Sequence, residues 1–350
     1  MFQIAVVGSG FMAKTWCMVA DQTENAEAVA VFGGSRCADF ASEYGLKAFD
    51  SLGAMLKSDD INVVIITSPP NAHYEQTIAA LSAGKHVLVE KPMAVDLNEA
   101  KQMTELAMKN GVTLGVVSQN RYRHSPKLAK KFISDGMNEL GDLKTILVKG
   151  QVERWWSGST PNSWKSTVES FDPWTGWASH ACDLVNWLVS DVPVDVFAVG
   201  SETYGLWETI TTGIRYANGT LATLMLDHVD KTPKNSPTMF FELRFEDGEI
   251  HFDTHGSLVL GKRGIWTSHG AELDSKQGQL SYTDDAVVKS PIRLNAYEAQ
   301  LQNFLEAVAA ARDPDVGISA GLMTQTVMEA VKNSVLSRSL VHLGDEMTFR

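Results

Sequence analysis

The sequence predicts an α/β protein with an N-terminal doubly wound parallel sheet and a C-terminal α+β domain whose sheet is largely antiparallel. Three observations support this fold class. Strand and helix patterns alternate up to about residue 120, hairpin signals recur after residue 195, and the 350 residues of the chain suffice for two domains. We place the domains at residues 1–120 and 121–350, with no obvious linker between them.

Short apolar runs separated by helical segments define the first domain. The expected strands are residues 2–7, 28–32, 63–67, 86–90 and 114–117, and the expected helices include 72–83 and 97–110. Such alternation is typical of βαβ units, which build a parallel sheet with helices on both faces.

The second domain has a different pattern. Residues 125–135 and 178–190 look helical, whereas Asn218-Gly219 and Asp247-Gly248 each lie between alternating runs. These dipeptides are the strongest short-range signal for a β-hairpin, so a largely antiparallel sheet is expected. A final helical region begins near Ala296 and is expected either to pack on this sheet or to return to the first domain.

A glycine-rich segment follows the first expected strand. Gly8, Gly10 and Ala13 form a G-x-G-x-x-A pattern where a helical segment begins. The first glycine permits a tight turn, the second permits close approach of a pyrophosphate, and the small third residue lets helix and strand pack. A helix N-terminus also attracts the anion. We therefore predict a dinucleotide-binding loop that includes Gly8, Gly10, Phe11 and Met12.

The end of the second expected strand bears on the choice of cofactor. An acidic residue there would hold the ribose 2′-hydroxyl of NAD, but this chain has Ser35 and Arg36 after two glycines. A hydroxyl and a guanidinium suit the 2′-phosphate of NADP, because arginine binds phosphate oxygens through two N–H groups. The sequence therefore favours NADP over NAD, although Arg36 could instead lie on the surface of the following helix.

The loop after the strand at 63–67 supplies further cofactor candidates, because ligands of open parallel sheets bind at the carboxyl ends of strands. These candidates are Ser68, Pro70, Asn71 and His73. Asn71 has an alternative role as a helix cap.

The expected buried strand at residues 86–90 ends abruptly in Glu90, Lys91 and Pro92. Glu90 and Lys91 are expected to line the cofactor crevice, with Lys91 where the reactive ring of a cofactor would lie. As a cation, Lys91 would hold a substrate oxygen and stabilise a developing alkoxide. Desolvation and the positive charge of an oxidised nicotinamide would lower its pKa, so it could instead carry the proton. An ordinary solvated lysine is the alternative.

Five of the nine tryptophans fall within one stretch, at Trp155, Trp156, Trp164, Trp174 and Trp177. Indole faces stack on the C–H faces of sugar rings, although tryptophans also fill cores and subunit interfaces. The candidates for substrate contact are Arg121, Tyr122, Arg154, Trp164 and Trp177.

Composition excludes several classes of protein. Hydrophobic residues make up 44% of the chain and charged residues 21%, as in globular proteins. A net charge of −12 without a basic run argues against a nucleic-acid partner, and no apolar stretch approaches a membrane span. The three cysteines lack the spacing of a metal site or a disulfide framework, so no metal is expected. The first strand begins directly after Met1, which together with the cysteines favours a cytoplasmic location.

The chain resembles the Gfo/Idh/MocA family, the glucose–fructose oxidoreductase and inositol dehydrogenase group, along essentially its full length. The resemblance rests on Gly8, Gly10 and Ala13, on the segment from Ala83 to Pro92, and on the run from His180 to Asp183. It implies a Rossmann domain and a second domain with an open-faced sheet that mediates homodimers or homotetramers. It also implies NAD(P)-dependent oxidation or reduction of a sugar, cyclitol or related polyol, and a cis Lys91–Pro92 bond.

The resemblance further implies that Lys91 and His180 are catalytic and contact the substrate, with His180 exchanging a proton. An ordinary imidazole pKa of about 6.5 suits that exchange near neutrality, whereas a buried structural histidine is the alternative. Dehydrogenases of the family usually carry an aspartate one helical turn earlier, where this chain has Gly176. Asp172 or Asp183 could orient the imidazole instead, and Asp183 is also a candidate for substrate contact.

Two other functions are compatible with the same motifs. A nucleotide-sensing regulatory protein would bind the cofactor without turnover. A hydrolase or lyase would use tightly bound NAD for a transient oxidation.

Overall fold

The computed structural model describes residues 1–134, 140–153, 173–203, 206–229, 239–255, 258–262, 265–269 and 291–344. The chain forms two compact units. One contains Met1–Gln119 with Val288–Gln325, and the other contains Asn120–Val287 with Thr326–Arg350.

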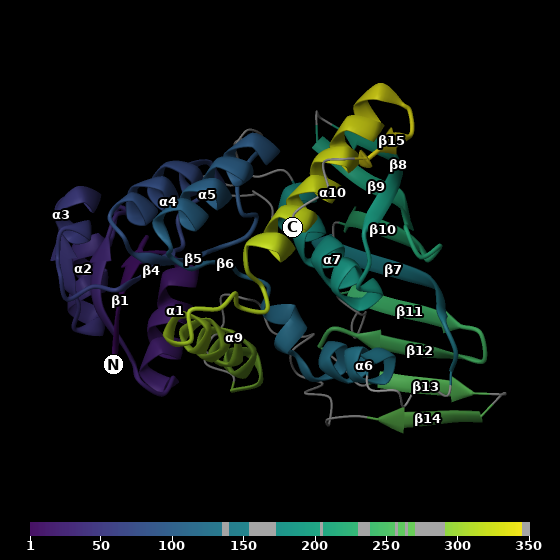
Figure 1. Cartoon of the computed structure of the whole chain (residues 1–350), viewed down its shortest axis with the longest axis horizontal. Coiled ribbons are helices and arrows are strands. Elements are labelled where there is room, and N and C mark those ends of the chain that lie inside the picture. Colours follow the sequence, from purple (N-terminus) through teal and green to yellow (C-terminus); the bar gives the residue numbers. More distant parts are fainter. Residues whose placement is uncertain are drawn as a thin grey trace. The chain divides into compact units, whose positions relative to one another are not determined.

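The first unit is built on a six-stranded sheet in the order β3-β2-β1-β4-β5-β6 (Figure 1). Its strands in chain order are β1 (Phe2–Val7), β2 (Ala26–Phe32), β3 (Lys47–Phe49), β4 (Val63–Ile66), β5 (His86–Val89) and β6 (Leu114–Val116). Every neighbouring pair is parallel. This is the strand order of a doubly wound nucleotide-binding sheet, with the switch point between β1 and β4. The predicted parallel sheet is confirmed.

Helices cover both faces of this sheet. They are α1 (Phe11–Gln22), α2 (Cys37–Tyr44), α3 (Leu52–Leu56), the 3-10 helix η1 (Pro70–Ala72), α4 (His73–Ser82), α5 (Leu97–Asn110), α9 (Pro291–Ala309) and the first part of α10 (Ile318–Ser337). Helices α1 and α9 pack together on one side, and α4 and α5 pack together on the other (Figure 1). The core between the sheet and α1 and α9 includes Ile65, Trp16 and Phe304.

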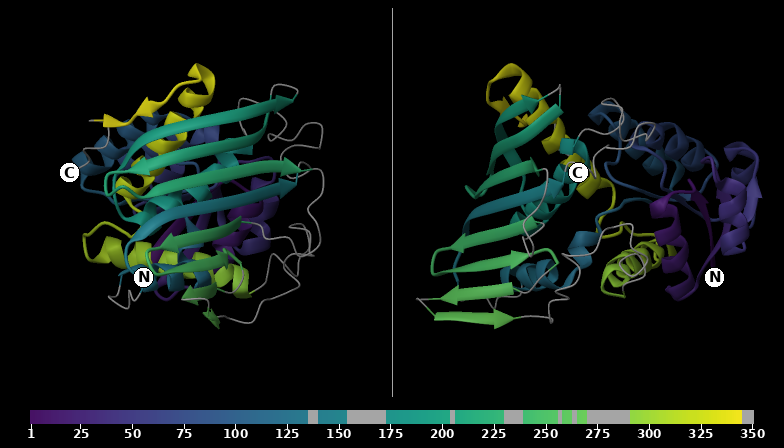
Figure 2. Two further views of the ribbon diagram at one scale, coloured as in Figure 1. Left: turned by 90° about the vertical axis from the view of Figure 1, so that its right-hand side faces the viewer. Right: turned by 180° about the vertical axis from the view of Figure 1, so that it is seen from behind.

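The second unit contains a larger sheet. Among the described residues its order is β14-β13-β12-β11-β7-β10-β9-β8-β15 (Figure 2). The strands are β7 (Leu143–Glu153), β8 (Pro193–Thr203), β9 (Leu206–Tyr216), β10 (Leu221–Val229), β11 (Met239–Phe245), β12 (Gly248–Asp253), β13 (Leu258–Lys262), β14 (Ile265–His269) and β15 (Val341–His342). The β7–β10 pair is parallel and the other pairs are antiparallel, so the largely antiparallel sheet is confirmed.

The two predicted hairpins lie in this sheet. Gly219, with a φ of +87°, joins β9 to β10, and Asp247-Gly248 joins β11 to β12. The positive φ of Gly219 is a conformation that glycine adopts without strain, whereas Gly248 is already the first residue of β12.

One face of the second sheet packs against helices. Helix α7 (Pro173–Val189) contacts β7, β9 and β10, and α6 (His124–Ser134), which follows the 3-10 helix η2 (Gln119–Tyr122), contacts β12 and β13. Residues that alternate along the strands are buried on this face, such as Val196 and Ala198 on β8. Their neighbours Phe197 and Val199 point the other way and are exposed. None of the described helices is long and apolar enough to cross a membrane.

Candidate active site

The glycine loop between β1 and α1 has the geometry of a pyrophosphate site. Gly8 has a φ of +115°, and a Cβ there would lie 2.6 Å from Thr67 Oγ1 at the end of β4. A Cβ at Gly10 would meet nothing within 4 Å, so the loop is open at that point. No side chain caps α1 at Gly10, and the first turn of α1 holds no acidic residue. The positive end of α1 is therefore suited to an anionic group, and this loop fits a dinucleotide.

The turn after β2 lies against the glycine loop. Gly33 and Gly34 both have positive φ, and a Cβ at Gly34 would lie 2.2 Å from Ser9 Oγ. Arg36 Nη2 donates a hydrogen bond to the carbonyl oxygen of Ser9 at 3.0 Å. The guanidinium therefore reaches back to the glycine loop from the end of β2, where the adenosine ribose of a dinucleotide would lie.

The loop after β4 holds the next group of predicted residues. Ser68 Oγ donates to Gln76 Oε1 at 2.6 Å, Pro70 is buried at the start of η1, and Asn71 is exposed. Helix α4 begins at His73 with Ala72 as its N-cap residue, so the alternative role of Asn71 as the cap of α4 is wrong. The His73 side chain is fully buried, with Nδ1 2.8 Å from the carbonyl oxygen of Pro92 and Nε2 2.9 Å from that of Ser68.

Hydrogen bonds of Glu90 connect the main chain at Lys91 to α1, the helix that begins at the glycine loop. Glu90 is buried, and its Oε1 accepts a hydrogen bond from Trp16 Nε1 of α1 at 3.0 Å. The other oxygen of Glu90 accepts from the backbone N–H of Lys91 at 3.3 Å. The Lys91–Pro92 bond is cis, as the resemblance implied. Lys91 is half-buried at this edge. No pattern in the sequence pointed to Trp16, because an apolar residue in a helix is ordinarily core.

In the second unit, His180 lies in a stripe of side chains along α7. Trp177 and Asp183 lie one turn before and one turn after it. The ring of Trp177 contacts that of His180 edge-on, with centroids 6.0 Å apart and an angle of 90° between planes. His180 and Asp183 are both buried. Gly176 lies in the same helix one turn before His180.

Asp183 forms a buried ion pair with Arg121 of η2. Arg121 Nε donates to Oδ2 at 2.7 Å and Nη2 donates to Oδ1 at 2.6 Å, so the contact is bidentate. The guanidinium also lies 5.7 Å from the ring centroid of Trp187. Burial and the charge of Arg121 lower the pKa of Lys130, which donates to the carbonyl oxygen of Trp187. Arg121 and Asp183, both named as substrate contacts from sequence, thus bind each other.

The remaining predicted residues divide by location. Tyr122 lies in η2 beside Arg121 and is half-buried. Arg154, Trp164 and Asp172 lie outside the described residues. Lys91 belongs to the first unit and His180 to the second.

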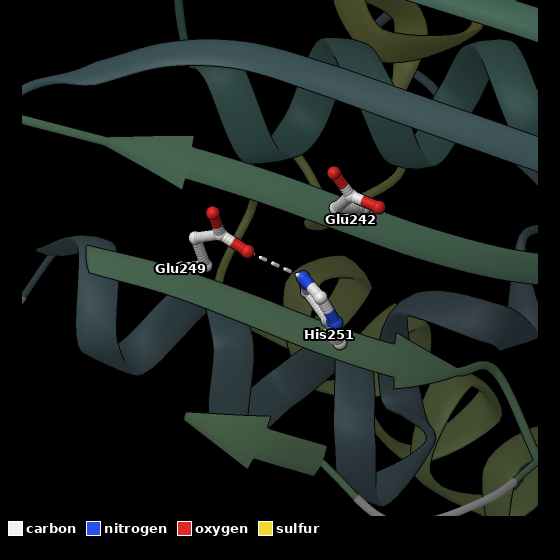
Figure 3. Close-up of side chains that lie close together, drawn as sticks. All are labelled: Glu242, Glu249 and His251. Carbon is white, nitrogen blue, oxygen red and sulfur yellow. Dashed lines mark hydrogen bonds and ion pairs between the residues drawn. The ribbon is translucent and has the colours of Figure 1, made fainter. Parts of the chain in front are cut away.

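One further cluster has the side chains of a metal site. Glu242, Glu249 and His251 of β11 and β12 present ligand atoms within 4.8 Å of one another (Figure 3). His251 Nε2 lies 3.0 Å from Glu249 Oε2. Arg244 Nε, however, donates to Glu242 at 2.8 Å and lies 3.8 Å from Glu249. One guanidinium already pairs with both carboxylates, so we interpret the cluster as an ion-pair network.

The doubly wound sheet and the glycine loop after its first strand define a dinucleotide-binding domain. The chain belongs to the Gfo/Idh/MocA family. The model described as "Oxidoreductase family, NAD-binding Rossmann fold" matches residues 2–118, and the model described as "Oxidoreductase family, C-terminal alpha/beta domain" matches residues 130–343. The family expected from the sequence is confirmed, and so is its NAD-binding Rossmann domain.

Relatives of known activity span the whole chain. The 1,5-anhydro-D-fructose reductase of Ensifer adhaerens is 26% identical over 91% of this chain and 93% of its own. The 2,7-anhydro-N-acetylneuraminate hydratase of Escherichia coli is 23% identical over 97% of this chain and 95% of its own. A levoglucosan dehydrogenase solved with NADH and levoglucosan shares the fold, with a TM-score of 0.82 and 21% identity over 98% of this chain and all of that one, 100%.

Proposed function

We propose that this enzyme transfers hydride between C4 of a nicotinamide and a carbon that bears a hydroxyl or carbonyl group, in a sugar, cyclitol or related polyol. The observation that carries the proposal is the position of Lys91 at the carboxyl end of β5, bonded through Glu90 to the helix that begins at the glycine loop. The reductase and dehydrogenase among the relatives support the substrate class. The bound cofactor would supply or accept the hydride.

Lys91 has the role of holding the substrate oxygen. Its ammonium stabilises negative charge that develops on that oxygen, and the half-buried position strengthens this interaction. When a carbonyl carbon gains hydride, the electron pair of the C=O π bond moves to the oxygen, which becomes an alkoxide. A cation within hydrogen-bond distance of that oxygen therefore lowers the barrier. In the alternative role, Lys91 itself moves the proton. The pH dependence of turnover distinguishes these two roles of Lys91.

His180 has the role of exchanging the proton with the substrate oxygen. Its imidazole is buried on α7 and its orientation is restricted by the edge contact with Trp177. The carboxylate usual in the family at position 176 is missing, and both oxygens of Asp183 accept hydrogen bonds from Arg121. We propose that packing against Trp177, rather than an aspartate one turn earlier, orients the ring. Trp177, Tyr122, Arg154 and Trp164 remain our candidates for contact with the sugar.

NADP is the proposed physiological cofactor. Arg36 lies against the glycine loop, and no acidic residue occupies the end of β2 where NAD-specific sites have one. Ser35 adds a hydroxyl at the same turn. The cofactor set at this edge would also include Gly8, Gly10, Phe11, Met12, Ser68, Pro70, Asn71 and Glu90.

A homodimer or homotetramer is proposed through the open face of the second sheet. The exposed side chains of this face include Phe197 and Val199 of β8 and Leu221 and Met225 of β10. Exposed apolar side chains that gather on one face of a sheet are typical of an interaction surface. We also propose a cytoplasmic location, since Cys17, Cys37 and Cys182 are all free thiols.

The decisive experiment follows the absorbance of NADPH and of NADH while purified protein is mixed with a panel of sugars, ketosugars and cyclitols. Oxidation of NADPH by one sugar class, or reduction of NADP⁺ in reverse, supports the proposal. The hydratase among the relatives supports a second candidate function. In that case the protein would be a lyase or hydratase that uses bound NAD. Substrate conversion with no net change in the cofactor would favour that candidate. Cofactor binding with no conversion of any compound would favour a regulatory role.

A further inference from the structure

His73 bridges two neighbouring loops at the carboxyl edge of the first sheet. Its Nδ1 lies 2.8 Å from the carbonyl oxygen of Pro92, which follows β5, and its Nε2 lies 2.9 Å from the carbonyl oxygen of Ser68, which follows β4. The side chain is fully buried. One imidazole therefore spans the loops after β4 and β5, and the second of these loops carries Lys91.

The two contacts of His73 cannot both be hydrogen bonds donated by a neutral ring. A carbonyl oxygen only accepts hydrogen bonds, and a neutral imidazole has one N–H. Burial lowers the pKa of His73 from its ordinary value, with a smaller contribution from the charge of Lys91, while the two carbonyl contacts act in the opposite direction. A neutral ring donates to one carbonyl oxygen only, so the tautomer decides which of the two loops it holds.

We propose that His73 is a positioning residue that holds the main chain at Pro92 and thereby sets the position of the Lys91 side chain. This inference rests on the proposed function, in which Lys91 holds the substrate oxygen. On the other side of Lys91, Glu90 accepts a hydrogen bond from the Lys91 N–H. The main chain around Lys91 is thus held on both sides of this residue. A displacement of a reacting group by about 1 Å costs roughly a hundredfold in rate.

Replacing His73 by asparagine or by glutamine tests its contact with Pro92 and its contact with Ser68 separately. An asparagine at position 73 places its amide nitrogen near the position of Nδ1, where it can donate to Pro92. A glutamine places its amide nitrogen near the position of Nε2, where it can donate to Ser68. His73→Leu retains the volume and removes both contacts. We expect His73→Asn to retain kcat within a few-fold, and His73→Gln and His73→Leu to lower kcat by about tenfold or more, with the cofactor dissociation constant changed less than threefold.

His86 provides the matched control. It is half-buried at the opposite end of β5, where its Nδ1 accepts a hydrogen bond from Thr113 N at 3.0 Å. His86→Asn removes a comparable imidazole from the same strand but far from the carboxyl edge. We expect it to leave kcat unchanged, whatever it does to the melting temperature.

Amide hydrogen exchange of the cofactor-bound protein gives a readout that needs no substrate. Faster exchange confined to the peptide around Lys91 in His73→Gln and His73→Leu, but not in His73→Asn, supports the inference even if no sugar is turned over. The inference is overturned if all three variants keep wild-type exchange and kcat. It is also overturned if all three lose kcat in proportion to a uniform loss of protection, because His73 would then serve only stability.

Discussion

Trp16 and Glu90, which are 74 positions apart, meet in the core of the first unit through a 3.0 Å hydrogen bond from the indole N–H to the carboxylate. The indole also packs edge-on against Tyr297 of α9, with ring centroids 5.3 Å apart. The helix at the glycine loop and the strand end that carries Lys91 are therefore joined by one buried polar contact.

Replacing Glu90 tests that contact. Glu90→Gln keeps an oxygen that can accept from Trp16, whereas Glu90→Leu leaves the buried indole N–H without its acceptor. Leaving such a group unpaired costs about 1–3 kcal/mol, so we expect Glu90→Leu to be less stable than Glu90→Gln by that amount. Urea unfolding followed by tryptophan fluorescence measures the difference. Equal stability of the two variants would show that the contact contributes little.

Lys91→Met removes the proposed cation while keeping most of the side-chain volume. We expect turnover to fall by about a hundredfold or more, because the developing alkoxide loses its charged partner. Cofactor affinity should change only a few-fold. Steady-state kinetics and fluorescence titration with NADPH test this, with exposed Lys109→Met as the control. Normal turnover by Lys91→Met would remove Lys91 from the mechanism.

Arg36→Ala is expected to weaken NADP binding much more than NAD binding. A hydrogen bond to a charged group contributes about 1.5–3 kcal/mol, which corresponds to roughly a tenfold to hundredfold loss for NADP. Isothermal titration calorimetry with both cofactors measures the two affinities. Parallel losses for NADP and NAD would mean that Arg36 supports the glycine loop through Ser9 and does not read the 2′-phosphate.

Asp183→Leu should destabilise the second unit by about 3–5 kcal/mol, because it leaves the buried guanidinium of Arg121 without its counter-charge. The double variant Arg121→Met/Asp183→Leu removes both charges, and we expect it to recover much of the loss. A double-mutant cycle, measured by urea unfolding, separates the interaction free energy of the pair from the effects of the individual side chains. Additive effects would contradict a direct coupling of these two residues.

The cysteines should differ in reactivity. Burial raises the pKa of Cys17 and of Cys182 to about 12, so neither forms appreciable thiolate at neutral pH. Cys37 is only half-buried, so we expect it alone to react with a disulfide reagent in the folded protein. Because the folded pKa values of Cys17 and Cys182 lie above the ordinary value, stability should decrease as the pH rises above about 9. Mass spectrometry after labelling identifies the modified thiol, and rapid labelling of Cys182 would contradict the prediction.

The sequence was most informative where function depends on local backbone chemistry. Gly8 is a glycine because of its positive φ and the close approach of Thr67. The turn after β2 likewise holds Arg36 against the glycine loop by a local backbone path. The end of β5 could also be predicted from the sequence. Two charged residues directly after a buried run indicate the edge of a parallel sheet, where ligands bind. The hairpins at Asn218 and Asp247 followed from turn chemistry for the same reason.

By itself, then, the sequence determined the alternating first unit, its glycine loop and the antiparallel character of the second sheet, since periodicity and turn chemistry act over a few residues. Only the tertiary structure decided which distant groups meet. The bidentate pairing of Arg121 with Asp183, the contact of Trp16 with Glu90, the bridge at His73 and the parallel pairing of β7 with β10 join segments whose separation leaves no local pattern. A buried polar group must find a partner, but which partner it finds depends on how the chain folds back on itself.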